Sequence, residues 1–174
     1  MSDEEDYSQY TGLTSELRVA HAPLEKDMVR RFVQAVMDDD PLYHDDAFAG
    51  STRFGGVVAP PLYPVHAFRR RPGTPDPLDA LKDDREADGS TGIGASVGLP
   101  PIKSPFKRLL NGGNEIEFYR CLRVGETAVS TSRYVDVSVK DGKSGKMLVV
   151  VIETDIRTQE GEPLLVNRQS LIWR

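Results

Sequence analysis

Residues 129–139, Val-Ser-Thr-Ser-Arg-Tyr-Val-Asp-Val-Ser-Val, decide the fold class of this chain. Valine alternates with serine or aspartate over much of the stretch, and a period of two is typical of a β-strand with one buried face. Asp141-Gly142 follows after Lys140 and is a hairpin signal. The apolar run 147–152 then predicts a fully buried strand, so these residues form an antiparallel hairpin.

Further elements flank this hairpin. Apolar and polar residues alternate over 116–124, Glu160-Gly161 predicts another turn, and residues 164–173 predict a last strand. Upstream, residues 24–36 place apolar side chains at helical spacing, and Pro41 ends that pattern. Helices first and an antiparallel meander afterwards indicate an α+β fold, in which a helix or a partner covers the apolar face of the sheet.

The length of 174 residues suits one domain. Residues 1–12 are acidic and aperiodic, which predicts a disordered lead before a single domain over 13–174. Within it, Pro61 predicts a second helix that Pro64 keeps short or irregular. From about 70 to 114, Pro, Gly, Asp and Ser are frequent, and we expect an inserted loop or lid there.

Composition excludes several classes of function. The net charge of -5 disfavours nucleic-acid binding. No apolar run approaches the roughly 20 residues of a membrane span, and the acidic N-terminus is unlike a secretory signal, so we expect a cytoplasmic protein without membrane contact. Cys121 is the single cysteine and cannot form an internal disulfide. His21 and His66 lie far from any ligand-spaced carboxylate pair, so we expect no metal site.

Residues 38–61 carry a family resemblance. They read Asp-Asp-Asp-Pro-Leu-Tyr-His-Asp-Asp-Ala-Phe-Ala-Gly-Ser-Thr-Arg-Phe-Gly-Gly-Val-Val-Ala-Pro-Pro. The segment resembles the motif of the MaoC-like hydratases and dehydratases, and the chain is similar to their N-terminal, dehydratase-like branch over roughly 14–174. The residues that match the family's motif are Asp38, Pro41, Leu42, Asp45, Ala49, Phe54, Gly55 and Ala59. The resemblance implies a hot-dog fold, an antiparallel sheet wrapped around a central helix, which pairs with a second copy of the fold as a double hot-dog.

The same resemblance exposes departures at the positions that carry chemistry. Hydration of an enoyl thioester needs a base for water, an acid for the α-carbon, and N–H donors for the developing enolate oxygen. In the family, an Asp and a His of this motif orient the water, and a Gly at the start of the central helix supplies the N–H donor. Here Asp38 keeps the first position, Tyr43 replaces the His, and Pro61 replaces the Gly. Tyrosine is a weak base near neutral pH and proline has no N–H, so two of the three functions are missing.

The resemblance therefore implies a non-catalytic subunit. Asp38, Tyr43 and His44 are the candidate residues of a degenerate site, and Gly55, Gly56 and Pro61 are candidate substrate-binding residues. The expected partner is a catalytic MaoC-like subunit that supplies Asp and His in a heterodimer or heterotetramer. The substrate is an acyl-CoA or acyl-carrier-protein thioester, and no cofactor is expected.

Two alternatives remain open. The chain is a self-sufficient homodimeric hydratase that uses Asp38 with Tyr43 or His44, or it is a hot-dog module that binds acyl-CoA without chemistry. Arg120 and Arg123 are expected to be salt-bridged or solvated, with contact to the phosphates of a thioester as the alternative. Cys121 is expected in a strand as an inert thiol.

Overall fold

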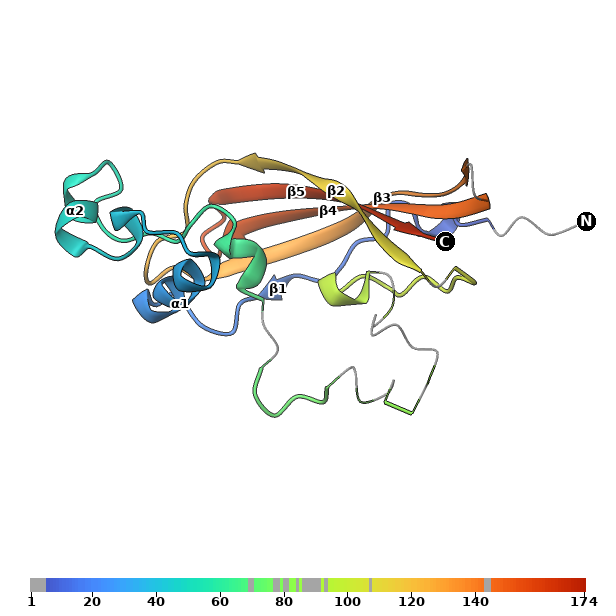
Figure 1. The fold of residues 1–174 in the computed structure, drawn as a ribbon, viewed down its shortest axis with the longest axis horizontal. Coiled ribbons are helices and arrows are strands. Elements are labelled where there is room, and N and C mark those ends of the chain that lie inside the picture. Colours follow the sequence, from blue (N-terminus) through green and yellow to red (C-terminus); the bar gives the residue numbers. More distant parts are fainter. Residues whose placement is uncertain are drawn as a thin grey trace, which may run out of the picture.

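The computed structural model describes residues 6–68, 71–76, 79, 82–83, 85, 92, 94–106, 108–142 and 145–174. A five-stranded antiparallel sheet runs through them in the order β1-β3-β4-β5-β2 (Figure 1). The strands are β1 (Arg18–Val19), β2 (Leu109–Phe118), β3 (Ala128–Gly142), β4 (Gly145–Thr158) and β5 (Pro163–Trp173). The hairpin and the meander predicted from 129–173 are thus present, and the α+β hot-dog architecture is confirmed.

Two α-helices, α1 (Lys26–Val36) and α2 (Asp46–Ser51), lie near one end of the sheet (Figure 1). The predicted amphipathic helix is α1, which buries Val29 and Val33 against the sheet. It ends at Val36, and the next residue, Met37, has a φ of 56°, the left-handed conformation that closes a helix C-terminus. None of the helices in the described ranges is long and apolar enough to span a membrane.

Short 3-10 helices complete the structure: η1 (Ser8–Tyr10), η2 (Pro41–Tyr43), η3 (Tyr63–His66) and η5 (Ala95–Val97). The segment after Pro61, predicted to be a short or irregular helix, is η3, a single turn of four residues. Pro64 lies within it and cannot donate the backbone hydrogen bond that a longer helix would require. The α-helix packed against the sheet is therefore α1.

The core consists of two apolar clusters on the inner face of the sheet. The first joins α1 to the near end of the sheet and includes Leu122 and Ile156. The second lies further along the sheet around Tyr134, Leu148 and Trp173. Between them, Ser132, Thr154 and Asn167 are cross-strand neighbours on β3, β4 and β5, and the Ser132 and Thr154 hydroxyls are 2.9 Å apart. A polar row thus divides the core.

This row corrects the orientation expected for 129–139. Ser130 and Ser132 were expected on the polar face, but each is 1% exposed, whereas Val135 is 39% exposed. The register of β3 on β4 shifts between Tyr134 and Asp136, as in a β-bulge. Because one extra residue reverses the side-chain alternation, the serines before the bulge and Val137 after it face inward.

Two expected segment boundaries also differ. Residues 6–12 were expected to be disordered, yet Tyr7 is 5% exposed in the second cluster and the Gly12 N–H donates to Tyr134 O at 2.9 Å. The inserted loop was expected to reach residue 114, but β2 begins at Leu109 and pairs with β5. Residues 94–106 also contribute the buried Leu99 and Ile102 to the core. The remainder of the expected loop lies largely outside the described residues.

Candidate functional site

The segment 38–61 begins directly after α1, and aspartates shape its first turns. The Asp40 N–H donates to Asp38 Oδ1 at 3.2 Å, and the Leu42 N–H donates to Asp40 Oδ1 at 2.9 Å. Asp45 caps α2 by accepting from the N–H groups of residues 47 and 48 at 2.9 and 3.0 Å. Asp38 is thus a turn-forming residue with one oxygen engaged by the backbone.

Tyr43 is half-buried at the end of η2 and packs against the first core cluster. Burial raises the pKa of its phenol, and the nearby negative charge of Asp38 raises it further. The phenol is therefore protonated near neutral pH, and in this form it cannot accept a proton from water. The structure brings Asp38, Tyr43 and Cys121 together, but it does not supply a base in place of the family's histidine.

His44 lies outside this group. Its side chain is exposed, and Nε2 lies 3.3 Å from the backbone carbonyl of Asp39. Tyr43 and His44 nevertheless line one hollow of about 250 Å³, on the flank of α1 that carries Lys26 and Arg30. The imidazole is thus placed at the rim of this hollow, within 3.3 Å of a carbonyl and without burial.

The candidate substrate-binding residues lie on the connection after α2. Gly55 is exposed with a φ of 71°, a conformation that glycine adopts without strain, and Gly56 is half-buried. Pro61 is exposed just before η3. The Ala59 N–H donates to Leu122 O at 2.8 Å, and the next two residues are prolines. The backbone here therefore offers no N–H at residues 60 and 61 for an oxyanion.

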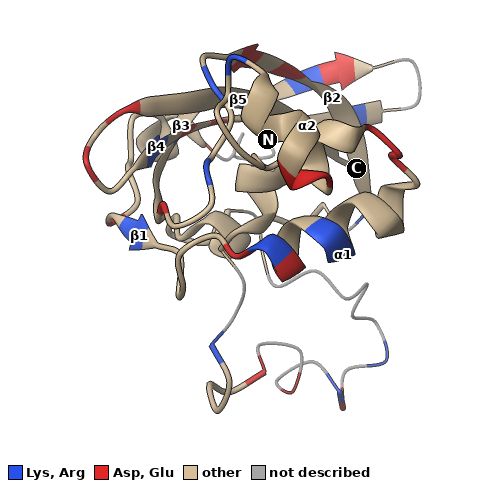
Figure 2. Ribbon diagram, turned by 90° about the vertical axis from the view of Figure 1, so that its left-hand side faces the viewer, with Lys and Arg blue, Asp and Glu red and all other residues tan. Residues whose placement is uncertain are grey.

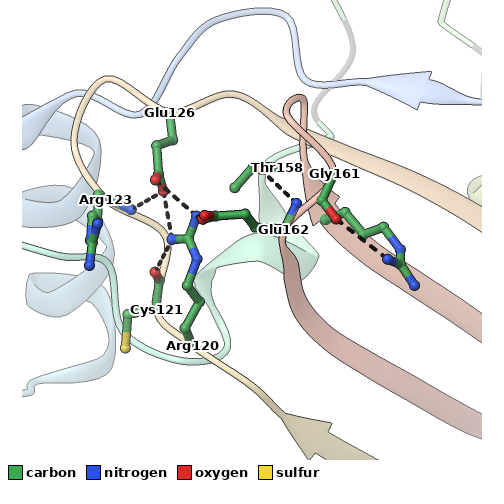
Figure 3. Close-up of polar contacts among 8 residues, drawn as sticks. Arg120, Cys121, Arg123, Glu126, Thr158, Gly161 and Glu162 are labelled. Carbon is green, nitrogen blue, oxygen red and sulfur yellow. Dashed lines mark hydrogen bonds and ion pairs between the residues drawn. The ribbon is translucent and has the colours of Figure 1, made fainter.

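The connection between β2 and β3 is hydrogen-bonded to this segment through Leu122 and contains a network of ion pairs. The Arg120 guanidinium forms a two-pronged ion pair with Glu126, each contact 2.9 Å, and a second pair with Glu162 (Figure 3). Burial opposes ionisation of Glu126, but the hydrogen bonds from Arg120 and from the Arg123 backbone outweigh it and lower the pKa of Glu126. The expectation that Arg120 is salt-bridged is confirmed, and the Arg123 side chain is exposed.

Cys121 was placed in a strand by its sequence, but it lies in this connection between β2 and β3. Its side chain is half-buried, and burial raises the pKa of the thiol. Cys121 and Tyr43 lie near each other although 78 positions separate them, and nothing local to either residue predicts this proximity. Within the described residues, no group of three His, Cys, Asp or Glu side chains is arranged to hold a metal.

Comparisons with known proteins agree with this architecture. The family described as FAS1-like, dehydratase domain region, matches residues 12–166. A UPF0336 protein of Thermobifida fusca is 25% identical over 146 residues, which cover 84% of this chain and 80% of the relative.

Two solved structures from Mycobacterium tuberculosis share the fold. The ChsH1-ChsH2 complex superposes with a TM-score of 0.66 at 20% identity, covering 91% of this chain and 83% of the other. The HadBC (3R-hydroxyacyl-ACP dehydratase) complex gives 0.58 at 13% identity, covering 94% and 98%. With its five-stranded sheet and its 38–61 segment, the chain belongs to the FAS1-like dehydratase-domain family, and it shares the hot-dog fold of MaoC-like dehydratases.

Proposed function

We propose that this chain is the non-catalytic subunit of a heteromeric enoyl-thioester hydratase, or of the dehydratase that runs the reverse reaction. One observation carries the proposal: Tyr43 and Pro61 occupy the two positions at which the family's chemistry needs a base and an N–H donor. The partner subunit then supplies the catalytic Asp and His, and this chain forms part of the wall of the acyl-thioester cleft.

The surroundings of Tyr43 and Pro61 support the proposal that this chain has no catalytic activity of its own. Tyr43 is held protonated by burial and by the neighbouring Asp38. Asp38 itself braces the turn after α1 through its contact with the Asp40 N–H. A preorganised oxyanion site is worth roughly a hundredfold to a thousandfold in turnover, and consecutive prolines remove the donors that would build one at residue 61.

The β2 edge supports the need for a partner. This strand is ten residues long, ends the sheet, and is exposed along nearly its whole length. Leu109, Leu110 and Phe118 are 41%, 37% and 48% exposed. A long edge strand with exposed apolar side chains is a template for pairing with another chain. A second hot-dog sheet joined here would pair the edge strand of each sheet and cover its apolar side chains.

The solved structures that share this fold also support a heteromer. ChsH1-ChsH2 and HadBC are each described as a complex, and HadBC is described as a 3R-hydroxyacyl-ACP dehydratase. Either CoA or an acyl-carrier protein therefore fits the proposal as the thioester carrier. The acyl group is left open between a fatty chain, an aromatic acid and a sterol side chain.

Asp38→Asn in the assembled enzyme tests the proposal. Asparagine keeps the side-chain oxygen that accepts the Asp40 N–H, so the turn is preserved while the carboxylate is lost. We expect turnover within several-fold of the unmodified assembly. A fall of about a thousandfold would assign catalysis to Asp38 and reject the proposal. The matched control is Asp40→Asn, which alters the neighbouring cap of η2 in the same way.

A homodimeric hydratase is the second candidate, because Tyr43 and His44 line one hollow. It requires Asp38 for turnover, so the same substitution separates the two candidates. Acyl-CoA binding without activity in any assembly would favour a third role, a binding module.

A further inference from the structure

A cavity of about 510 Å³ lies on the flank of α1 away from Tyr43. Its floor is apolar and buried, formed by residues that are each at most 8% exposed: Ala20, Leu24, Tyr63, Leu122 and Ala128. Ligand pockets range from roughly 300 to 1,000 Å³ and combine apolar walls with few polar groups. A cavity of about 150 Å³ already holds benzene, so this volume suits a molecule of considerably more atoms.

An aromatic wall closes one side of the cavity. Phe32 lies between Tyr63 and His66, with ring-centre distances of 5.5 and 5.4 Å. Met28 and Ala35 continue this wall along α1, and Ala67 lies on the η3 side. A rigid aromatic surface beside small alanine side chains leaves room for a bulky apolar group without rearrangement of the core.

The charges at the rim select against anions. Arg31 is the only Arg or Lys among the described residues that line the cavity, and its Nε donates to Asp27 at 2.6 Å. Glu25 and Glu126 add negative charge, and Glu126 is already paired with Arg120. Figure 2 shows basic and acidic residues next to each other on α1. Among the described residues that line the cavity, Glu25, Asp27 and Glu126 thus outnumber Arg31, so the rim is acidic and disfavours a phosphate or carboxylate.

The cavity also lies away from the proposed partner edge. Its sheet residue, Ala128, opens β3, which β4 and β5 separate from β2. A second sheet joined along β2 would leave this side of the molecule uncovered. None of Asp38, Tyr43, His44 and Pro61 lines it.

We infer that this cavity is a second binding site, which takes an uncharged, mainly apolar small molecule and works independently of the proposed acyl-thioester cleft. The ligand packs its apolar body on the Phe32 wall and leaves any polar group at the rim between α1 and η3. The assignment does not depend on the catalytic status of the chain.

A displacement assay tests the inference. The chain with bound Nile red, a neutral dye, is titrated with 1-decanol or with decanoate, and release of the dye reports binding. We expect saturable binding of 1-decanol, with decanoate weaker by at least about tenfold because its carboxylate meets an acidic rim. Absence of saturable binding up to the solubility limit of the alcohol would overturn the inference. Equal or tighter binding of decanoate would overturn the ligand class.

Two substitutions localise the site. Ala35→Trp and Ala67→Trp fill the cavity from α1 and from the end of η3, and each should weaken decanol binding by about tenfold or more. Val36→Trp is the matched control, because Val36 is the next residue of α1, is 52% exposed and does not line the cavity. Ala35 is on the exposed side of the helix, so Ala35→Trp should fold even if Ala67→Trp does not. Wild-type affinity in a folded Ala35→Trp protein would place the binding elsewhere and reject the site.

Discussion

Arg120 donates hydrogen bonds to the carboxylate of Glu126 from both terminal nitrogens, Nη1 to Oε2 and Nη2 to Oε1, at 2.9 Å each. Both side chains are 22% exposed, and the Arg120 Nη1 also donates to Cys121 O at 2.9 Å. The pair therefore holds the β2–β3 connection, which carries Leu122 beneath the candidate site. Paired carboxylates of this kind contribute more than exposed ones because solvent screens them less.

Arg120→Met should lower the free energy of unfolding by about 2 kcal/mol, since it leaves Glu126 partly buried without its counter-ion. Urea denaturation followed by circular dichroism measures the change. Arg157→Met serves as the control: its pair with Asp155 is more exposed, and the expected loss is under about 0.5 kcal/mol. Equal losses in the two variants would contradict a special role for Arg120.

The contribution of Glu126 should depend on pH. Its pKa in the folded chain is lowered from an ordinary 4.5, so its stabilisation is fully present above that value and is lost as pH falls through the lower, folded-state pKa. Glu126→Gln should therefore be less stable than the unmodified chain at pH 7, and the difference should shrink progressively in acid. Thermal unfolding of both proteins between about pH 7 and pH 3 measures it. A difference that stays constant or grows in acid would contradict the assignment.

Gly94 should not tolerate a side chain. Its φ is 85°, and a Cβ built there would collide with the hydroxyl of Tyr134, which donates to Pro100 O at 2.9 Å. We expect Gly94→Ala to lower the free energy of unfolding by about 3 kcal/mol. Gly161→Ala separates strain from collision, because Gly161 has a φ of 93° but open space around it, and should cost about 1 kcal/mol. Similar losses in the two variants would show that Tyr134 moves aside without cost.

Charge on the β2 edge should prevent assembly. Leu110→Lys combined with Phe118→Lys places two ammonium groups on the exposed edge strand, and inward or edge lysines block strand pairing. We expect the double variant to fold but to lose co-purification with its partner subunit. Val19→Lys is the control, since Val19 is 45% exposed on β1, the opposite edge of the sheet. Loss of the complex in Val19→Lys alone would locate the interface on the other edge.

The elements of the fold follow from local patterns, while their orientation does not. The spacing of apolar residues in 24–36 and in 129–173 predicts α1 and the three long strands correctly, because each pattern reports one face of one element. The inward position of Ser130 and Ser132 depends on the bulge at Tyr134, which only the pairing of β3 with β4 reveals. The defined structure of residues 6–12, which were expected to be disordered, likewise depends on the burial of Tyr7 in a cluster that is distant in sequence.

The candidate site shows the same limit. The aspartates of 38–45 were predictable as turn-forming residues from their types and spacing. The raised pKa of Tyr43 was not, because it arises first from burial and only then from the charge of Asp38, and local sequence does not reveal burial. The cavity beside α1 also combines residues from three separate segments, 20–35, 63–67 and 122–128, and no local pattern marks such a set.

Tyr43→His should not restore hydratase activity to the isolated chain. The substitution supplies a base at the family's position, but Pro61 still provides no N–H donor for the enolate oxygen. Hydration of crotonyl-CoA measures the outcome, with circular dichroism as the control for folding. Measurable turnover from this single change would show that the missing donor does not limit the chain.

The central claim is that the chemistry resides in a partner chain. Crotonyl-CoA hydration by the purified chain alone, with its oligomeric state determined by light scattering, and then by the chain co-expressed with its genomic neighbour, tests this claim most directly. The account predicts no turnover from the chain alone and turnover from the complex. Turnover from a homo-oligomer of this chain would contradict it, because Asp38 and a second group would then form a working site.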